Sequence, residues 1–360
     1  MKKMSRFLGM MSAALVSTAV ATNADALTIN LVNTGGVEQG TAAYIGFRAA
    51  ADYWESVLTD DVTLNFRVGF TSVGFAPTTL GQASSSSGTK STSSWKTALT
   101  NDATTALDAS VVANLPNITT ANVRLNTSLQ KALGLYTGSA TANDATITFN
   151  SARAFDFDTR DGFQTASSDF ISVAVHEMGH ALGFTSAVGQ NTTNNSTPSN
   201  TDMFRYKNGV WDTTWGGDPY FSIDGGATEF MGNAGFSAGP DGFQTSHWRE
   251  GGRIHDGVSC TILTEPQVGI LDPTGGICQE GIVTAQDLAI MDAMGWNLNL
   301  DILQNLDYKM TTSQILTNYL NAQSAVPESS TWAMMIVGFG FVGAGLRRRD
   351  AKVRTKVRFA

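Results

Sequence analysis

The amino-acid sequence predicts an α+β protein, and three observations lead to this prediction. Alternating apolar residues indicate short strands at residues 27–32, 62–70 and 145–149, and apolar residues at helical spacing indicate a long helix at residues 41–58. A glycine-rich stretch at residues 216–242 has little regular pattern. The chain has 360 residues, of which 42% are hydrophobic and 15% charged, so it can bury one large core or two small ones.

The first half of the chain supplies most of the predicted sheet. The strand at residues 62–70 alternates large apolar residues with Thr63, Asn65 and Arg67, which predicts one buried face. The helix at residues 41–58 carries a single apolar stripe (Tyr44, Phe47, Ala51, Trp54 and Leu58). Residues 84–94 are rich in Ser and Thr and predict a surface loop, and residues 95–115 predict a partly helical segment.

Helices dominate the predictions for the second half. A helix is expected at residues 169–182, with Ser168 or Asp169 as its N-cap and Gly183 at its end. Another is expected at residues 285–294, where Thr284 and Asp287 fit a capping box and Gly295 ends the helix. Residues 301–319 predict one more helix, and the polar residues 190–200 predict a loop.

The N-terminus has the features of a secretion signal. Three basic residues precede an apolar run at residues 7–21, and an A-x-A site ends at Ala26. We therefore expect a signal peptide at residues 1–26, cleaved after Ala26. The alternative, a membrane anchor, is less consistent with so short a run.

The C-terminus has a second pattern. Pro327 and Glu328 precede an apolar stretch at residues 332–346, which can form a short membrane helix, and a basic cluster follows (Arg347, Arg348 and Arg349). The alternative is a plain C-terminal anchor. The order of the three elements resembles the PEP-CTERM sorting tail of Gram-negative bacteria, here at residues 326–360. This resemblance implies transient membrane anchoring, cleavage by an exosortase near Pro327 and Glu328, and delivery to the cell surface or extracellular matrix.

The charge of the chain is unevenly distributed. Its formal net charge is −8, but both terminal segments are basic. The part between them keeps 13 of the 23 Lys and Arg and 28 of the 31 Asp and Glu, a net charge of −15. Such a body suits solubility outside the cell and argues against nucleic acid as a partner.

His176, Glu177 and His180 form an H-E-x-x-H motif inside the helix predicted at residues 169–182. Residues four apart on a helix lie on one face, so both imidazoles can reach one zinc ion. Zinc lowers the pKa of a bound water and polarises a carbonyl, and Glu177 can take the proton of that water as general base. The motif therefore predicts a catalytic Zn²⁺ site.

A catalytic zinc ion needs a third protein ligand. The chain has four histidines, which leaves His247 and His255. Ser186 occupies the position of the third histidine in the short metzincin pattern H-E-x-x-H-x-x-G-x-x-H, and serine is a poor zinc ligand. An acidic ligand, Asp202 or Glu229, is an alternative, whereas His255 fits a solvated loop better.

Four segments together resemble the leishmanolysin-like metzincins. They are H-E-M-G-H-A-L-G-F at residues 176–184, S-H-W at residues 246–248, the turn I-L-D-P at residues 270–273 and a helix followed by Gly295 and Trp296. In that family an insertion separates the glycine from the third histidine, which implies His247 as the third ligand. Leu271 then stands where the family has the Met of its Met-turn, a hydrophobic floor that leucine can also form.

The resemblance also implies the architecture. A twisted mixed sheet with long helices lies above a mostly irregular C-terminal subdomain. Residues 27–186 correspond to the N-terminal catalytic subdomain with the zinc helix, residues 187–300 to the subdomain with His247 and Leu271, and residues 301–325 to a helix or linker. The strand at residues 145–149 is expected at the sheet edge, where an extended peptide can pair with it.

Two further features are less specific. Cys260 and Cys278 flank the turn at residues 270–273, and in an exported protein we expect one disulfide between them rather than two free thiols. Residues 156–162 are acidic but lack the spacing of an EF-hand, so a solvated turn is favoured over Ca²⁺ binding.

The leading functional hypothesis is an exported zinc endopeptidase acting on protein or peptide substrates. The alternative is a catalytically inactive binding protein of the cell surface or biofilm matrix, with a vestigial metal site. Glu177 favours the enzyme, because a purely structural zinc site needs no general base.

Overall fold

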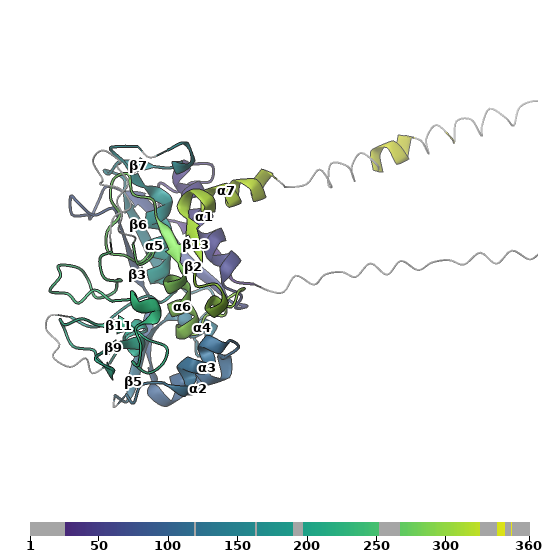
Figure 1. Cartoon of the computed structure of the whole chain (residues 1–360). Coiled ribbons are helices and arrows are strands. Elements are labelled where there is room, and N and C mark those ends of the chain that lie inside the picture. Colours follow the sequence, from purple (N-terminus) through teal and green to yellow (C-terminus); the bar gives the residue numbers. More distant parts are fainter. Residues whose placement is uncertain are drawn as a thin grey trace, which may run out of the picture.

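The computed structural model describes residues 26–118, 120–162, 164–189, 197–251, 267–324, 337–342 and 347 (Figure 1). The predicted signal peptide before Ala26, the sorting residues Pro327 and Glu328, and Arg348 and Arg349 lie outside these residues, whereas Arg347 is exposed. Within the described part, no helix is long and apolar enough to cross a membrane. The predicted C-terminal membrane helix falls mostly outside that part.

A four-stranded mixed sheet forms the upper half of the molecule, and the α+β prediction is confirmed. Its strands are β1 (Thr28–Asn33), β2 (Thr63–Thr71), β6 (Ala145–Asn150) and β3 (Gly81–Ser85), in that order. The pairs β1–β2 and β2–β6 are parallel, and β6–β3 is antiparallel. The three predicted strands are therefore confirmed, with ends that differ by about one residue.

The prediction that residues 145–149 form the sheet edge is wrong. Strand β6 lies between β2 and β3, so β3 is the edge next to the helix that carries the H-E-x-x-H motif. Residues 84–94 are not a loop either. They form the end of β3, then β4 (Ser87–Ser91), which pairs with β5 (Asn122–Asn126), and then the start of a helix.

Residues 84–91 form strands because their backbone is paired, not because their side chains favour strands. Each short Ser/Thr strand is held by ladder hydrogen bonds to a partner distant in the sequence, β6 for β3 and β5 for β4. Small hydroxylated side chains tolerate a half-exposed strand, so their composition alone does not distinguish strand from loop.

Helices α1 (Ala42–Val57) and α5 (Phe170–Leu182) pack together and against the sheet, and both agree with prediction. Their close approach needs Gly46, because a Cβ there would lie 2.3 Å from the ring of Phe170. The Nε1 atom of Trp54 donates to the Val175 carbonyl at 3.2 Å. These contacts anchor α5, the helix that carries the H-E-x-x-H motif.

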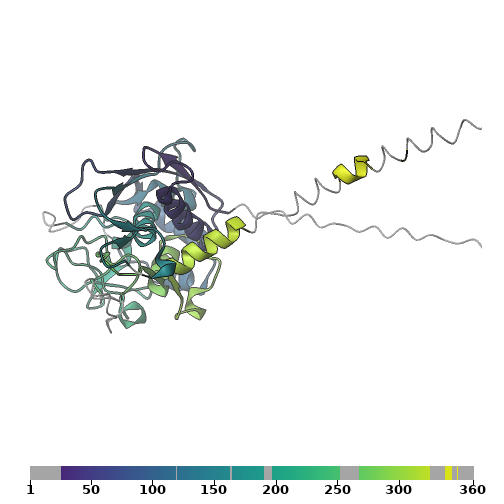
Figure 2. The same ribbon diagram turned by 90° about the horizontal axis from the view of Figure 1, so that it is seen from above.

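The remaining helices complete the core. The partly helical prediction for residues 95–115 is confirmed by two of them, and the capped helix after Thr284 is α6. The helix predicted at residues 301–319 begins only at residue 312, after a strand, and Figure 2 shows it beside α1. The helices are α2 (Thr92–Asp102), α3 (Ala106–Ala113), α4 (Thr127–Ala132), α6 (Ala285–Met294) and α7 (Thr312–Ser324).

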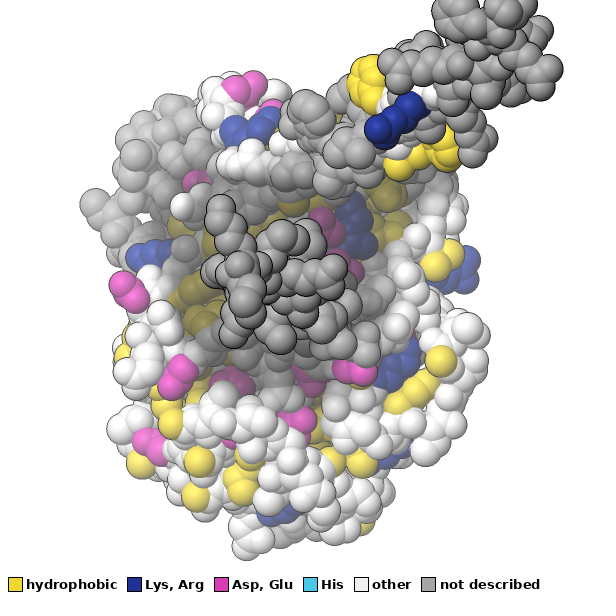
Figure 3. All heavy atoms as spheres, turned by 90° about the vertical axis from the view of Figure 1, so that its right-hand side faces the viewer, with side chains coloured by type: hydrophobic (Ala, Val, Ile, Leu, Met, Phe, Trp, Pro, Cys, Tyr) yellow, Lys and Arg dark blue, Asp and Glu magenta, His cyan; other side chains and the backbone are white. Residues whose placement is uncertain are grey.

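The region after α5 is mostly irregular, as predicted, with short strands and 3-10 turns. Its short strands are β9 (Arg205–Lys207), β10 (Val210–Trp211), β11 (Tyr220–Phe221), β12 (Ile282–Thr284) and β13 (Lys309–Thr311), and its 3-10 turns are Thr201–Phe204, Phe230–Gly232 and Ile302–Gln304. Before α5 lie two more short strands, β7 (Phe155–Asp156) and β8 (Ser168–Asp169), and the 3-10 turn Thr159–Asp161. Figure 3 shows one face of the molecule, on which charged side chains are scattered among uncharged polar ones.

Candidate metal centre

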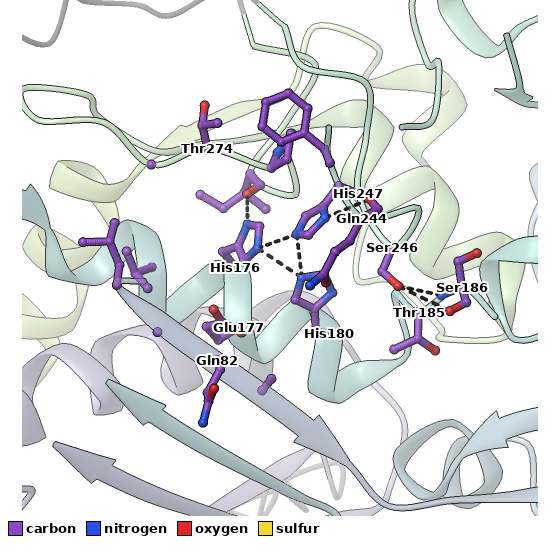
Figure 4. A pocket seen from close by; sticks show the side chains of 18 of the residues that line it. Gln82, His176, Glu177, His180, Thr185, Ser186, Gln244, Ser246, His247 and Thr274 are labelled. Atoms are coloured by element: carbon purple, nitrogen blue, oxygen red, sulfur yellow. Dashed lines mark hydrogen bonds between the residues drawn. The ribbon is translucent and has the colours of Figure 1, made fainter. Parts of the chain in front are cut away.

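Three histidines from two parts of the chain converge on one point (Figure 4). His176 and His180 project from consecutive turns of α5, and His247 comes from a segment without regular secondary structure. The Nε2 atoms lie 3.0 Å apart between His176 and His180, 3.2 Å between His180 and His247, and 3.3 Å between His247 and His176. The structure therefore brings together the three predicted ligands.

The other ring nitrogen of each histidine faces a backbone carbonyl. The Nδ1 atom of His176 lies 2.8 Å from the oxygen of Ile270, that of His180 2.7 Å from Phe184, and that of His247 3.1 Å from Gln244. A carbonyl oxygen only accepts, so each Nδ1 must carry the proton and donate it. Each Nε2 then presents its lone pair to the common point, the tautomer that a metal ligand needs.

The geometry fits a metal ion. Three lone pairs at such short separations repel one another unless a cation lies between them. Zn–N bonds of about 2.0–2.1 Å in tetrahedral geometry place neighbouring nitrogens about 3.3–3.4 Å apart, close to the observed separations. Among the described residues, no other group of three or more His, Cys, Asp or Glu side chains converges in this way.

Burial keeps these imidazoles neutral. It lowers the pKa of His176 to about 3, with a further contribution from His180. Burial likewise lowers the pKa of His180 and of His247. Because only a neutral imidazole can bind a metal, the enclosed site favours the ligand form at neutral pH.

Glu177 lies between the histidines and the edge strand β3, next to Gln82 in Figure 4. Its side chain is buried, and burial raises its pKa to about 8, although a hydrogen bond from the Ala83 backbone amide lowers it. A cation held by the three histidines would lower this pKa, because an opposite charge favours the carboxylate. Glu177 is thus placed to gain and release a proton near neutral pH.

The turn at residues 270–273 supports the helix from below. Leu271 is fully buried, and its Cδ2 atom lies 2.7 Å from where a Cβ on Gly179 would be, which explains the glycine between the two helix histidines. The Leu271 carbonyl accepts a hydrogen bond from the Trp248 amide at 3.0 Å, next to His247. The same turn therefore contacts both parts of the centre.

Asp287 organises this turn, a role that the sequence did not reveal. Beyond its capping box, it accepts from the Ile270 amide at 2.8 Å and from Nε1 of Trp248 at 2.8 Å. The capping pattern of Thr284 and Asp287 was visible in the sequence, but nothing in it indicated the distant partners. Ile270 also faces His176 through its carbonyl, and Trp248 adjoins His247, so this buried carboxylate connects α6 to both parts of the centre.

A second network holds the segment of His247 to the loop after α5. The Ser246 Oγ atom accepts from the Ser186 amide at 3.0 Å (Figure 4), and the Ser186 hydroxyl donates to Asp202 at 2.5 Å. Asp202 also accepts from the Ala187 amide at 2.8 Å. Ser186 and Asp202, considered above in relation to the third ligand, thus belong to the support of His247.

A cavity of about 1030 Å³ opens over the three histidines. The edge of β3 forms one wall, and the segment at residues 273–276 contributes to the other, as Gln82 and Thr274 indicate on opposite sides of the histidines in Figure 4. The cavity continues past Ser85 to β4 and β5. Its volume is at the upper end of the range of about 300–1,000 Å³ that is typical of small-molecule pockets.

The other predicted site residues lie elsewhere. Glu229, like Asp202, is not part of the histidine group. His255 and Cys260 lie outside the described residues, so the predicted disulfide stays a prediction, although Cys278 is buried. In the acidic turn, Asp158 pairs with Arg160 at 2.7 Å and Asp156 accepts the Asp158 amide at 3.0 Å, so the chain itself satisfies these carboxylates.

No family model matches the chain, and neither a curated protein nor a solved structure matches it.

Proposed function

We propose that this protein is an exported, zinc-dependent endopeptidase. The observation that carries the proposal is the convergence of three neutral imidazoles beside a buried carboxyl group, at the floor of a large cleft. Imidazole ligands suit zinc as well as copper, nickel and iron, and the proposal takes zinc because the separations of the Nε2 atoms fit a tetrahedral site.

His176, His180 and His247 would hold the ion. When bound, it supplies a Lewis acid that polarises a carbonyl and makes a water molecule more acidic. Glu177 accepts the proton of the attacking water and donates it to the leaving amine. Its burial, which raises its pKa to about 8, makes the carboxylate a stronger base and favours the first step. The neighbouring cation lowers this pKa and favours release of the proton in the second step.

The position of β3 at the edge of the sheet favours a peptide as the substrate. The strand pairs with β6 on one side only, so its other side can form ladder hydrogen bonds with an extended chain. Gly81, Gln82 and Ala83 of this strand line the cavity, and the Ala83 amide interacts with Glu177. A chain paired with β3 would therefore place its backbone carbonyls beside the general base.

We also propose membership of the leishmanolysin-like metzincins. The motif residues, the distant His247 and the buried Leu271 beneath Gly179 support it, because this leucine lies where a hydrophobic floor is needed. Secretion through the signal at residues 1–26 and sorting by an exosortase at Pro327 and Glu328 are part of the same proposal. Their support is the order of residues in the sequence.

Metal content and casein hydrolysis of three proteins test the proposal: the mature wild type, Glu177→Ala and His247→Ala. The wild type should contain one zinc ion per chain and cleave casein. Glu177→Ala should keep the zinc and lose activity by a factor of about 10²–10⁴, the usual contribution of a general base. His247→Ala should lose both, because two ligands are insufficient.

The controls separate the alternatives. Unchanged casein cleavage by Glu177→Ala would refute the mechanism. Full zinc retention by His247→Ala would show that another residue is the third ligand. A wild type that holds zinc and cleaves no protein or peptide would favour the inactive binding protein.

A further inference from the structure

The cleft extends beyond the catalytic groups at the end formed by β4 and β5. Strand β3 continues through Ser86 into β4, and the cavity is lined there by Ser87, Asn126 and Arg124. Asn126 lies next to the metal centre, since its Nδ2 atom donates to the His180 carbonyl at 3.0 Å. Arg124 is two residues earlier on the same face of β5, a separation of about 7 Å along the strand.

Hydrogen bonds of the Arg124 backbone fix the residue in place, and its side chain does not contribute to them. Its amide donates to the Pro198 carbonyl at 2.8 Å, and its strand pairs with β4 opposite Thr89. The side chain is exposed in the cleft and takes part in none of the ion pairs or side-chain hydrogen bonds found in the described part of the chain. The neighbouring Lys90, in contrast, is occupied by the Leu135 carbonyl.

The charges that line the cleft are few. Apart from the three histidines, the described lining residues include one cation, Arg124, and one carboxyl group, Glu177. The chain as a whole carries a net charge of −8. An arginine without a partner, in a partly enclosed cleft of an acidic protein, is a local site for an anion, because a guanidinium binds a carboxylate through two parallel hydrogen bonds.

We propose that Arg124 forms a subsite for a carboxylate of the substrate, so that the cleft selects peptides with an acidic group near the cleaved bond. This inference rests on the proposed peptidase function. An extended chain advances about 3.3 Å per residue, so the carboxylate lies about two to four residues from that bond. Either an Asp or Glu side chain or a free C-terminus can supply it.

Peptides that differ at one position test the subsite. One series carries Glu or Gln at successive positions and an amidated C-terminus, and one Gln peptide has a free C-terminus. For the full-length protein loaded with zinc, one Glu position should raise kcat/KM about tenfold over Gln. A gain from the free C-terminus alone would identify the terminal carboxylate as the group recognised.

Arg124 variants and a matched control assign the effect. Arg124→Gln should abolish the preference, and Arg124→Glu should reverse it toward a Lys peptide. Arg67→Gln is the control, because Arg67 is also exposed on a strand but does not line the cleft, and it should keep the preference. Equal kcat/KM for the Glu and Gln peptides in the wild type would overturn the subsite.

A binding measurement separates this inference from the function on which it rests. Fluorescence anisotropy with Glu177→Ala, in which cleavage is blocked, should give about tenfold tighter binding of the preferred Glu peptide, a difference absent in Glu177→Ala/Arg124→Gln. Selective binding without hydrolysis by the wild type would refute the peptidase and leave the subsite in place. Hydrolysis by the wild type together with equal binding of the Glu and Gln peptides would refute the subsite and leave the peptidase in place.

Discussion

The two parts of the metal centre are held in different ways. In α5 the helix itself sets the spacing of His176 and His180, and the Nδ1 acceptor of His180 is Phe184, four residues away. Around His247 the support is distant: Ser246 is bonded to Ser186, 60 residues away, and Trp248 to Asp287, 39 residues away. The spacing of the two helix histidines thus depends on local structure, although the Nδ1 acceptor of His176, the Ile270 carbonyl, is 94 residues away. The position of His247 depends more on the fold being complete, because the residues on both sides of it are held by distant partners.

The largest expected effect comes from removing the hub of the distant support. Asp287→Ala leaves several buried amide and indole N–H groups without an acceptor, each at a cost of about 1–3 kcal/mol. We expect the free energy of unfolding to fall by at least about 3 kcal/mol and the zinc affinity to fall 10–100-fold. Urea unfolding of the apoprotein and competition with a chelator measure the two quantities.

Asp108→Ala is the matched control. Asp108 forms the same kind of capping box with Thr105 at the start of α3 but has no contact with the histidine segments. Its removal should cost about 1 kcal/mol, as for other caps, and leave zinc affinity unchanged. Equal losses of zinc affinity in both variants would contradict the special role of Asp287.

The difference between local support in α5 and distant support around His247 explains which parts of the site could be predicted from the sequence. Residues within about four positions of one another predict the helix α5, its end at Gly183 and the shared face of His176 and His180. They also limit its N-cap to Ser168 or Asp169, and the structure has Asp169. The choice of His247 came from a family resemblance and from the small number of histidines. Ser186, Asp202 and Asp287 as supports were not predictable, because their partners are set by tertiary packing.

In the sheet, too, the strands with a local sequence pattern were predictable, and the strand that depends on a distant partner was not. Strands β1, β2 and β6 could be predicted from alternating apolar residues, because one face of each strand is buried. Strand β3, which forms the wall of the cleft, has a short polar sequence, and its place at the edge depends on pairing with β6. The strand that lines the cavity above the histidines was thus the one least visible in the sequence.

A smaller effect is expected where only one link of the distant support is cut. Ser246→Ala removes the acceptor of the Ser186 amide while His247 itself is retained. We expect zinc affinity to fall about tenfold, as for other residues that position a ligand, with a loss of about 1 kcal/mol in stability. Ser246→Thr, which keeps the hydroxyl, should restore the affinity.

Ser110→Ala is the control for this variant, because the Ser110 hydroxyl donates to the Ile223 carbonyl at 3.0 Å in another part of the molecule. It should lower stability by a similar amount and leave zinc affinity unchanged. If Ser246→Ala and Ser110→Ala bind zinc equally well, the hydroxyl of Ser246 does not position His247.

The smallest effect on zinc affinity is expected at the local support, the N-cap of α5. Asp169 accepts from the Ile171 amide at 2.9 Å and the Ser172 amide at 3.0 Å, and the Thr312 hydroxyl donates to its other oxygen. Burial raises the pKa of Asp169 to about 6, although these hydrogen bonds lower it. Because the folded pKa lies above the unfolded one, the folded state retains the proton to higher pH, and stability is lost as the pH rises from about 4 through about 6.

Asp169→Asn removes this titration and keeps an oxygen for the cap. Relative to the wild type, the variant should therefore be more stable at pH 7.5 than at pH 4.5 by about 1–3 kcal/mol, the energy of one to two pKa units. Urea unfolding of both metal-free proteins at the two pH values measures it. The same stability difference at both pH values would mean that Asp169 is ionised throughout. Zinc affinity at pH 7.5 should stay unchanged, because α5 positions its two histidines through the helix itself and not through the charge at its start.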